Sequence, residues 1–245
     1  AVAAALAVDR WCYRPLRALP TIYTVIASFG VALIFRSLTQ IIWGAENQVY
    51  IEGVVLPVEF SSGLVLSLTH AVAIVTLVVL AIALHIFLTH SRVGRSMRAV
   101  ADDPELASVA GLDTERVIRW TWIIGAGLAA IAGVIAAMDT DVHPNLGWNL
   151  LLPMFAATIL GGIGKPMGAL VGGLVIGLAE ELTSYPLLSV EPFTSLALWL
   201  QELSGHEFLL DDALIPSSYK SAVAFFIMVV LLIFRPQGLF KGRLL

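Results

Sequence analysis

One positively charged residue lies inside a long apolar stretch of the sequence. Arg36 falls within the apolar run 21–43. At about 1.5 Å of helical rise per residue, it lies on the order of 10 Å before the end of that run. A cation at such a depth in a membrane can bind a substrate carboxylate. Arg36, together with Gln40 one turn further on, is therefore a candidate for lining a substrate path. The structural alternative is that Arg36 extends to the membrane surface or pairs with an acid such as Glu180 or Glu181.

Other groupings of reactive side chains give weaker evidence for a functional site. Asp139, Asp141 and His143 could ligate a metal, but three groups without a fourth, beside a Pro-Asn pair, are more typical of a solvated turn. We therefore predict no metal site. No Ser/His/Asp grouping recurs at an interpretable spacing, so the sequence predicts no catalytic residue and no enzyme.

The sequence lacks the loop that binds the phosphates of ATP. Such a loop needs glycine-rich backbone followed by Lys and then by Ser or Thr. The Gly-Lys pair at Gly164-Lys165 is followed by Pro166 between two apolar runs. We expect no cofactor in this chain, and any ATP must be used by partner subunits.

The segment 91–119 carries strong helix-boundary signals. Asp103 is suited to cap a helix, Pro104 to its first position, and Glu105 to its first turn. Gly111 is a natural stop. These residues predict a short helix at about 104–110. Because so short a helix is not stable alone, it must pack on its own bundle or lie in a groove of a partner.

The residues that this short helix turns outward are expected to be few and small, namely Ala107, Ser108 and Ala110. Asp113 or Thr114 then caps a second helix that leads into the next apolar run. The alternative is a solvated loop whose arginines only set the membrane topology. Capping at both ends favours a rigid element, which topology alone does not require.

The elements that hold these residues follow from composition. The chain of 245 residues is 58% hydrophobic and 13% charged, whereas about a quarter of a soluble domain is charged. Its apolar runs occupy 21–43, 69–89, 120–138, 150–163, 168–185 and 215–234. Since a span needs about 20 residues, we predict an all-α, polytopic transmembrane bundle with about six crossings. The run 150–163 is short, and Pro153 is expected to disturb its first turn, so it is predicted to be tilted or re-entrant.

Residues 1–8 read as the stub of an apolar helix. The chain has no initiator Met, and we expect that an N-terminal piece with one or more spans is missing.

Lys and Arg occupy every second gap between the apolar runs. No Lys or Arg occurs at 44–68, 139–149 or 186–218. The basic residues of the gaps fall instead in 10–17, in 91–119, at Lys165 and after residue 234. This alternation is what the positive-inside rule produces. It predicts a multi-pass protein of the bacterial inner membrane with a cytoplasmic C-terminus. It leaves no basic stripe for a nucleic-acid partner.

Small residues recur every fourth position on two of the runs. The predicted helix-packing positions are Gly125, Gly133, Gly168, Gly172, Gly173 and Gly177. Gly161 and Gly162 precede the sharp turn at 164–166 and break a pair of short crossings. Irregular backbone at membrane depth lines cavities, so these two glycines join the candidates for the substrate path.

The outer segment 186–218 is the longest connection. Its residues Leu196, Trp199, Leu200 and Leu203 have helical spacing. They predict an amphipathic helix on the periplasmic surface, with a disordered loop as the alternative. We treat residues 1–245 as one transmembrane domain.

Five motifs, in the same order along the chain, resemble a known family. They are Tyr13-Arg14-Pro15-Leu16-Arg17, the segment from Gly94 to Val117, Gly125 to Gly133, Leu160 to Ala169, and Arg235-Pro236-Gln237-Gly238-Leu239. The sequence is similar to the permeases of branched-chain amino acid ABC transporters, and more to the LivH type than to its LivM partner. The resemblance covers most of the chain.

The resemblance implies three kinds of protein partner besides the lipid bilayer: a second, LivM-like permease, two ATP-binding subunits and a periplasmic substrate-binding protein. It also implies that the segment 91–119 is a cytoplasmic coupling loop seated in the ATPase. The coupling positions carried over are Arg95, Arg98, Asp102, Asp103, Pro104, Glu105, Ala107 and Gly111. The outer segment 186–218 is longer than expected for this type.

Three classes of function remain open from the residues. A self-contained secondary transporter or channel should carry coupling acids deep in its spans, and this chain has almost none there. A membrane scaffold gives no reason for a capped inner helix. The permease of an importer fits both the scarcity of acids in the spans and the capped inner helix. Branched-chain amino acids are its expected substrate. Urea, short amides or another small solute remain alternatives.

Overall fold

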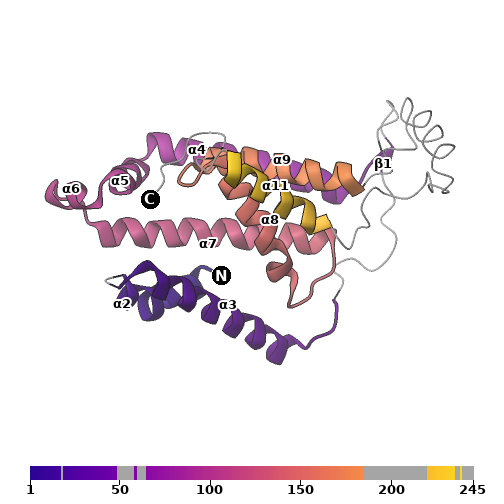
Figure 1. Cartoon of the computed structure of the whole chain (residues 1–245), viewed down its shortest axis with the longest axis horizontal. Coiled ribbons are helices and arrows are strands. Elements are labelled where there is room, and N and C mark those ends of the chain that lie inside the picture. The colour runs from indigo at the N-terminus through magenta and orange to yellow at the C-terminus, as the bar shows by residue number, and fades with distance from the viewer. Residues whose placement is uncertain (18, 49–57, 60–64, 185–219, 235–237, 239–245) are drawn as a thin grey trace. The chain divides into compact units, whose positions relative to one another are not determined.

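The computed structural model describes residues 1–17, 19–48, 58–59, 65–184, 220–234 and 238 of the chain. These residues form helices joined by short turns, together with two strands of two residues each (Figure 1). The all-α prediction is confirmed. The predicted amphipathic helix in 186–218 lies outside the described residues.

The chain divides into two compact units, Ala1–Gly147 and Trp148–Leu245. The prediction of one permease domain over 1–245 stays a prediction.

Three helices of the first unit are long and apolar enough to cross a membrane. They are α3 (Thr21–Trp43), α4 (Leu68–His90) and α7 (Thr114–Asp139). None of the 23 residues of α3 or the 23 residues of α4 is buried within the described structure. Large apolar side chains that stay exposed along whole helices need lipid or a partner helix as their surroundings. The three corresponding apolar runs are therefore confirmed as membrane-length helices.

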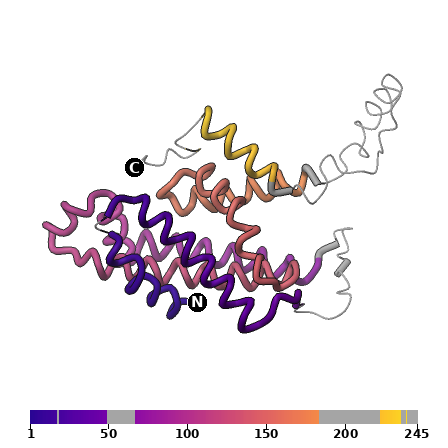
Figure 2. Tube along the Cα trace, turned by 60° about the horizontal axis from the view of Figure 1, so that its bottom comes forward, coloured from indigo at the N-terminus to yellow at the C-terminus, as the bar shows by residue number. Residues whose placement is uncertain are grey.

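A compact corner joins α4 to α5 (Arg92–Asp102). The side chain of Ser91 caps α5 by accepting a hydrogen bond from the Gly94 amide at 2.8 Å. A Cβ at Gly94 would lie 2.5 Å from the Phe87 carbonyl oxygen, so only glycine fits this close backbone approach. The corner brings α5 against α7, and α6 (Pro104–Val109) follows beyond the start of α7 (Figures 1 and 2).

The opposite ends of α3, α4 and α7 are joined by polar contacts. Gln48 and Val142 form an isolated antiparallel bridge. His70 Nε2 lies 3.1 Å from Asp139 Oδ1, which joins the start of α4 to the end of α7. Between α3 and α4, β1 (Val58–Glu59) pairs antiparallel with β2 (Val65–Leu66).

The described helices of the second unit are α8 (Leu146–Gly161), which begins two residues before the unit boundary, α9 (Pro166–Ser184) and α11 (Lys220–Phe234). Its core is a small cluster from all three helices: Ala156, Leu160, Ile176 and Ala224. Helix α8 begins four residues before the predicted run, so Pro153 lies inside it and not in its first turn. The prediction about Pro153 is wrong because the apolar run understates the helix, whose first turn contains Gly147 and Asn149. An interior proline is tolerated in an apolar helix when neighbouring groups satisfy the freed carbonyl.

Candidate functional site

The short helix α6 is fixed at its first turn by its own sequence. The Asp103 side chain accepts a hydrogen bond from the Leu106 amide at 2.9 Å. Pro104 takes the first helical position, where its missing N–H has no intrahelical partner to lose. Glu105 places a carboxylate beside the positive end of the helix dipole. The predicted start of this helix is confirmed.

The end of α6 is closed by a two-bond turn. Gly111 has φ +83°, its amide donates to the Ser108 carbonyl at 3.0 Å, and the Leu112 amide donates to the Ala107 carbonyl at 3.0 Å. This is the Schellman arrangement, which favours glycine because its left-handed backbone conformation strains other residues. The helix is therefore closed at both ends over Pro104–Val109, one residue shorter than predicted.

The next helix starts immediately. Asp113 caps α7 by accepting from the Arg116 amide at 3.0 Å, and Thr114 is the first helical residue. Of the two capping residues left open by the sequence, Asp113 is the one used.

The exposed face of α6 is larger and more apolar than the sequence suggested. Leu106 is 67% exposed and Val109 is 85% exposed, whereas Ala107 is only 5% exposed. The prediction that Ala107 faces outward is wrong, because this small side chain turns inward where α6 packs on α5 and α7. Leu106 and Val109, three residues apart, share one helix face. We call this pair the α6 apolar face.

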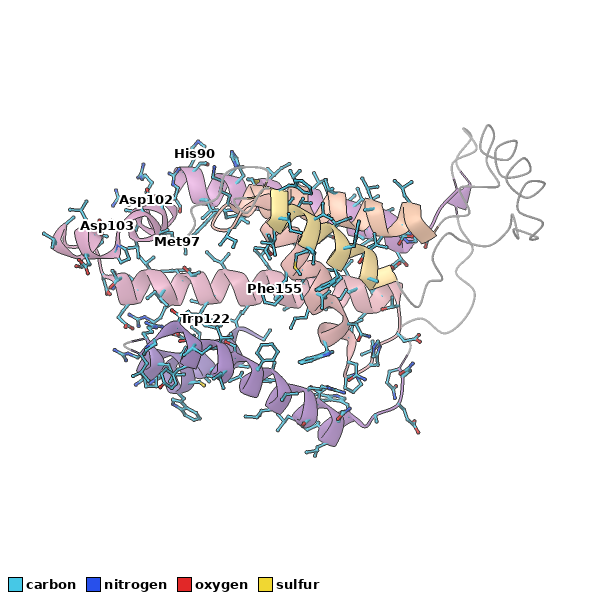
Figure 3. All side chains as sticks on the ribbon, viewed as in Figure 1. His90, Met97, Asp102, Asp103, Trp122 and Phe155 are labelled. Atoms are coloured by element: carbon cyan, nitrogen blue, oxygen red, sulfur yellow. The ribbon has the colours of Figure 1, made fainter. Side chains whose placement is uncertain are left out.

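Basic side chains lie on the neighbouring helix. Arg95 and Arg98 on α5 are exposed, and an Arg98 guanidinium nitrogen lies 3.5 Å from the Thr89 carbonyl. Asp102 and Asp103 are adjacent at the junction of α5 with α6, as Figure 3 shows. A partner that receives α6 therefore meets a rigid apolar tip beside charged groups of both signs.

The N-terminal helices are fastened to the start of α7 by an ion-pair network. Asp9 lies in a π-helical turn, η1 (Asp9–Tyr13), which links α1 (Val2–Val8) to α2 (Arg14–Leu16). Its carboxylate is bound by the Arg17 guanidinium, and the same Arg17 reaches Glu115 Oε1 at 3.0 Å. Arg14 Nε lies 3.6 Å from Glu115 Oε2. We call these four residues the N-terminal clamp.

An aromatic contact continues the same attachment. The rings of Tyr13 and Trp122 stack with centroids 5.2 Å apart, and Figure 3 shows Trp122 on the side of α7 that faces the N-terminal helices. The Tyr13 hydroxyl donates to Ser28 Oγ at 3.1 Å, which ties in α3. The sequence predicts that Arg14 and Arg17 set the topology, and both belong to one of the five family motifs. The presence of Asp9 among basic residues was the available signal for an ion pair.

The candidates for the substrate path fall in different settings. Arg36 and Gln40 are half-buried on α3. Gly161 and Gly162 are buried, and a Cβ at Gly161 would lie 2.1 Å from the Gly168 carbonyl oxygen. The close contact gives Gly161 a packing role, and its role in a path stays a prediction.

The predicted packing glycines divide into two groups. A Cβ at Gly168 would lie 2.1 Å from the Gly161 carbonyl oxygen, and one at Gly172 would lie 2.1 Å from the Ala157 carbonyl oxygen. These glycines allow α8 and α9 to touch through their backbones. Positions that would meet no described atom within 4 Å are Gly125, Gly133 and Gly177, while Gly173 has ordinary contact at 3.9 Å. A packing role for this second group stays a prediction.

Two sequence motifs meet in the second unit. Gly238, with φ +71°, is buried, and a Cβ there would lie 2.6 Å from the Ile159 carbonyl oxygen and 2.8 Å from Gly162 Cα. The Gly161-Gly162 pair and the C-terminal motif thus share one tight contact.

In the described part of the chain, no group of three or more His, Cys, Asp or Glu side chains could hold a metal ion.

Comparison with known families identifies the family of this chain. A family model described as the permease component of branched-chain amino acid transport systems matches residues 1–232. The chain belongs to this family. The predicted resemblance is therefore confirmed, and it spans both units of the permease.

Individual relatives are also permease proteins of transport systems. The high-affinity branched-chain amino acid transport system permease protein LivH of Escherichia coli K12 is 30% identical over 243 residues, which cover 95% of this chain and 68% of that protein. The BraD permease protein of Pseudomonas aeruginosa is 28% identical over 239 residues, with the same coverage of 95% and 68%. The fructose import permease protein FruG of Bifidobacterium longum is 27% identical over 124 residues, covering 48% of this chain and 36% of that protein. No solved structure matches the chain significantly.

Proposed function

We propose that this chain is a membrane-embedded permease subunit of an ABC importer for branched-chain amino acids. The observation that carries the proposal is the match of the branched-chain permease family over residues 1–232. The membrane-length helices α3, α4 and α7 supply the membrane part. ATP is bound and hydrolysed by separate subunits, and the chain itself performs no chemical reaction.

The charge pattern supports a topology. The start of α7, with Arg116 and Arg119, faces the cytoplasm, and its other end at Asp139 faces the periplasm. Two shorter apolar helices, α8 and α11, together with α9, bring the proposed crossings to six in a bacterial inner membrane. The C-terminus is then cytoplasmic.

The structure of α6 supports a role in coupling to ATP hydrolysis. A helix capped at both ends keeps its shape when it is pushed, and its apolar face gives a partner groove something to hold. Contacts of α6 with α5 and α7, and of α5 with α4, connect this tip to two spans. Closure of the ATP-binding subunits moves α6, and the spans follow as rigid elements.

The proposed assembly contains a second, LivM-like permease, two ATP-binding subunits and a periplasmic binding protein. The apolar faces of α3 and α4, which remain exposed in the described structure, provide surface for the second permease and for lipid. Arg36 and Gln40 on α3, with Gly161 and Gly162 after α8, are the proposed lining of the substrate path. Arg95, Arg98, Asp102 and Glu105 are the proposed polar partners of the ATPase.

Uptake by the reconstituted transporter tests the function. In proteoliposomes that contain the full complex, with ATP enclosed and the binding protein added outside, we expect ATP-dependent uptake of radiolabelled leucine. Fructose, the sugar named for the FruG relative, should not be taken up. Uptake of leucine without ATP would instead indicate a secondary transporter. Uptake of fructose or urea in place of leucine would contradict the proposal that the substrate is a branched-chain amino acid.

Cysteine labelling near the two ends of α7 tests the topology. In a Cys12→Ser background, which removes the single cysteine, we expect Ser108→Cys to react with a membrane-impermeant maleimide only after the cytoplasmic side is opened. The matched Thr140→Cys variant lies just beyond the other end of α7 and should react in intact cells. Ser108 and Thr140 are both exposed, so access to the side of the membrane decides the result. Labelling of both positions from the same side would contradict a crossing by α7.

A further inference from the structure

A cleft rich in arginine lies between the N-terminal helices and the first turns of α7. It encloses about 250 Å³ and is lined by Leu6, Asp9, Arg10, Arg14, Glu115 and Arg119. All of these residues belong to the first unit. The cleft adjoins the N-terminal clamp but extends beyond it to Arg10 and Arg119.

The charges around the cleft do not cancel. Arg17 binds both carboxylates of the clamp, Asp9 and Glu115. Asp9 lines the cleft, but it is only 5% exposed and is held by this arginine. Arg14 also pairs with Glu115. The four arginines at the site, Arg10, Arg14, Arg17 and Arg119, still outnumber the two carboxylates, so the site carries a net positive charge. Guanidinium groups bind phosphate oxygens through paired, charge-assisted hydrogen bonds.

The surroundings of the cleft place it at the membrane surface. Trp11 is 81% exposed beside Arg10, and Trp120 is exposed beside Arg119. Tryptophan is enriched where the headgroups of lipids meet the acyl chains. Leu6 adds an apolar side chain to the lining of the cleft. A ligand for this site therefore combines an anionic group with an apolar tail.

We propose that this cleft binds the phosphate headgroup of an anionic phospholipid in the cytoplasmic leaflet. The proposal rests on the proposed function for its orientation in the membrane. Basic pockets on the cytoplasmic side of membrane helices attract anionic headgroups. The bound lipid supports the attachment of α1 and η1 to α7, next to the start of the coupling segment.

Lipid retention by the purified complex tests the proposal. Native mass spectrometry after exchange into phosphatidylglycerol or phosphatidylcholine should show preferential retention of phosphatidylglycerol. The Arg10→Gln/Arg119→Gln variant should weaken that retention by about 25-fold, since each basic residue near an anionic surface contributes about fivefold. The control variant Arg92→Gln/Arg116→Gln removes the same charge from exposed positions outside the cleft and should change retention by less than about twofold.

Two further arms separate the possible results. The Arg10→Lys/Arg119→Lys variant keeps the charge and should retain phosphatidylglycerol. Its normal assembly with the partner subunits shows that the cleft has folded. Inorganic phosphate should not displace the lipid at millimolar concentration, and if phosphate alone binds equally well, the ligand is a soluble anion and the proposal is wrong.

Failure of this inference can be told apart from failure of the proposed function. A complex that imports leucine but retains both lipids equally overturns the lipid site alone. A complex that retains phosphatidylglycerol through Arg10 and Arg119 but does not transport leucine overturns the importer function alone.

Discussion

Replacing both Leu106 and Val109 with serine is expected to detach the ATP-binding subunits while the membrane part stays folded. The two side chains form the α6 apolar face and are 67% and 85% exposed, so they contribute little to packing within the chain. If they fill a groove of the ATPase, their burial contributes to binding. Fully burying a Leu or Val side chain is worth about 1.5–3 kcal/mol. With partial burial, a loss of about 2–4 kcal/mol weakens binding roughly 30- to 1000-fold.

The measurement is the amount of ATP-binding subunit that co-purifies with the permease, together with leucine-stimulated ATP hydrolysis. Ser108→Ala is the matched control, because Ser108 lies exposed on the same helix and its hydroxyl bonds only the local Glu105 carbonyl among the described contacts. Association should then change by less than about twofold. Normal association and uptake by the double serine variant would show that α6 is not the docking element.

The boundaries of α6 were predictable because they depend on contacts between near neighbours in sequence. The Asp103 carboxylate reaches an amide three residues later. The helix is closed by the Gly111 amide, which bonds a carbonyl three residues back, and by the Leu112 amide, which bonds one five residues back. Such signals are complete within a short stretch of sequence. The face that α6 exposes was not predictable in this way. It depends on where α5 and α7 lie, and the expectation of small outward residues failed when Ala107 turned inward.

The N-terminal clamp shows the same limit more strongly. Arg17 and Glu115 are 98 positions apart, and no local pattern links them. The arginines near the N-terminus satisfied the positive-inside rule, so topology alone already accounted for them. The structure gives two of them a second role, in ion pairs with α7.

Length and composition predicted the membrane-length helices because a bilayer sets the number of apolar residues in a span. The contacts between helices were harder to predict, since a run of small residues shows that close approach is allowed but not where it occurs. Gly168 and Gly172 lie at a backbone contact, whereas Gly125 and Gly133, which continue a four-residue repeat through Ala129, face no described neighbour within 4 Å.

The second large effect is a loss of stability, which we expect for Gly172→Ala at the contact between α8 and α9. The added Cβ would lie 2.1 Å from the Ala157 carbonyl oxygen and 2.8 Å from the Gly161 nitrogen. Both are backbone atoms of α8, so no side chain can rotate away and the helices must separate by more than about 1 Å. Overpacking of this kind costs about 1–3 kcal/mol or more. In a membrane the separation also forfeits the dispersion contacts that hold helices together.

The neighbouring position supplies the control for this variant. Gly173→Ala adds the same methyl group on the same helix, but the new Cβ would meet only the Ala157 side chain, at an ordinary 3.9 Å. Unfolding of the purified complex in a titration with SDS should show a loss of about 2–3 kcal/mol for Gly172→Ala and less than about 0.5 kcal/mol for Gly173→Ala. Both variants raise helix propensity equally, so propensity cannot produce a difference between them. Equal stability of the two variants would mean that α8 and α9 do not touch through their backbones at Gly172.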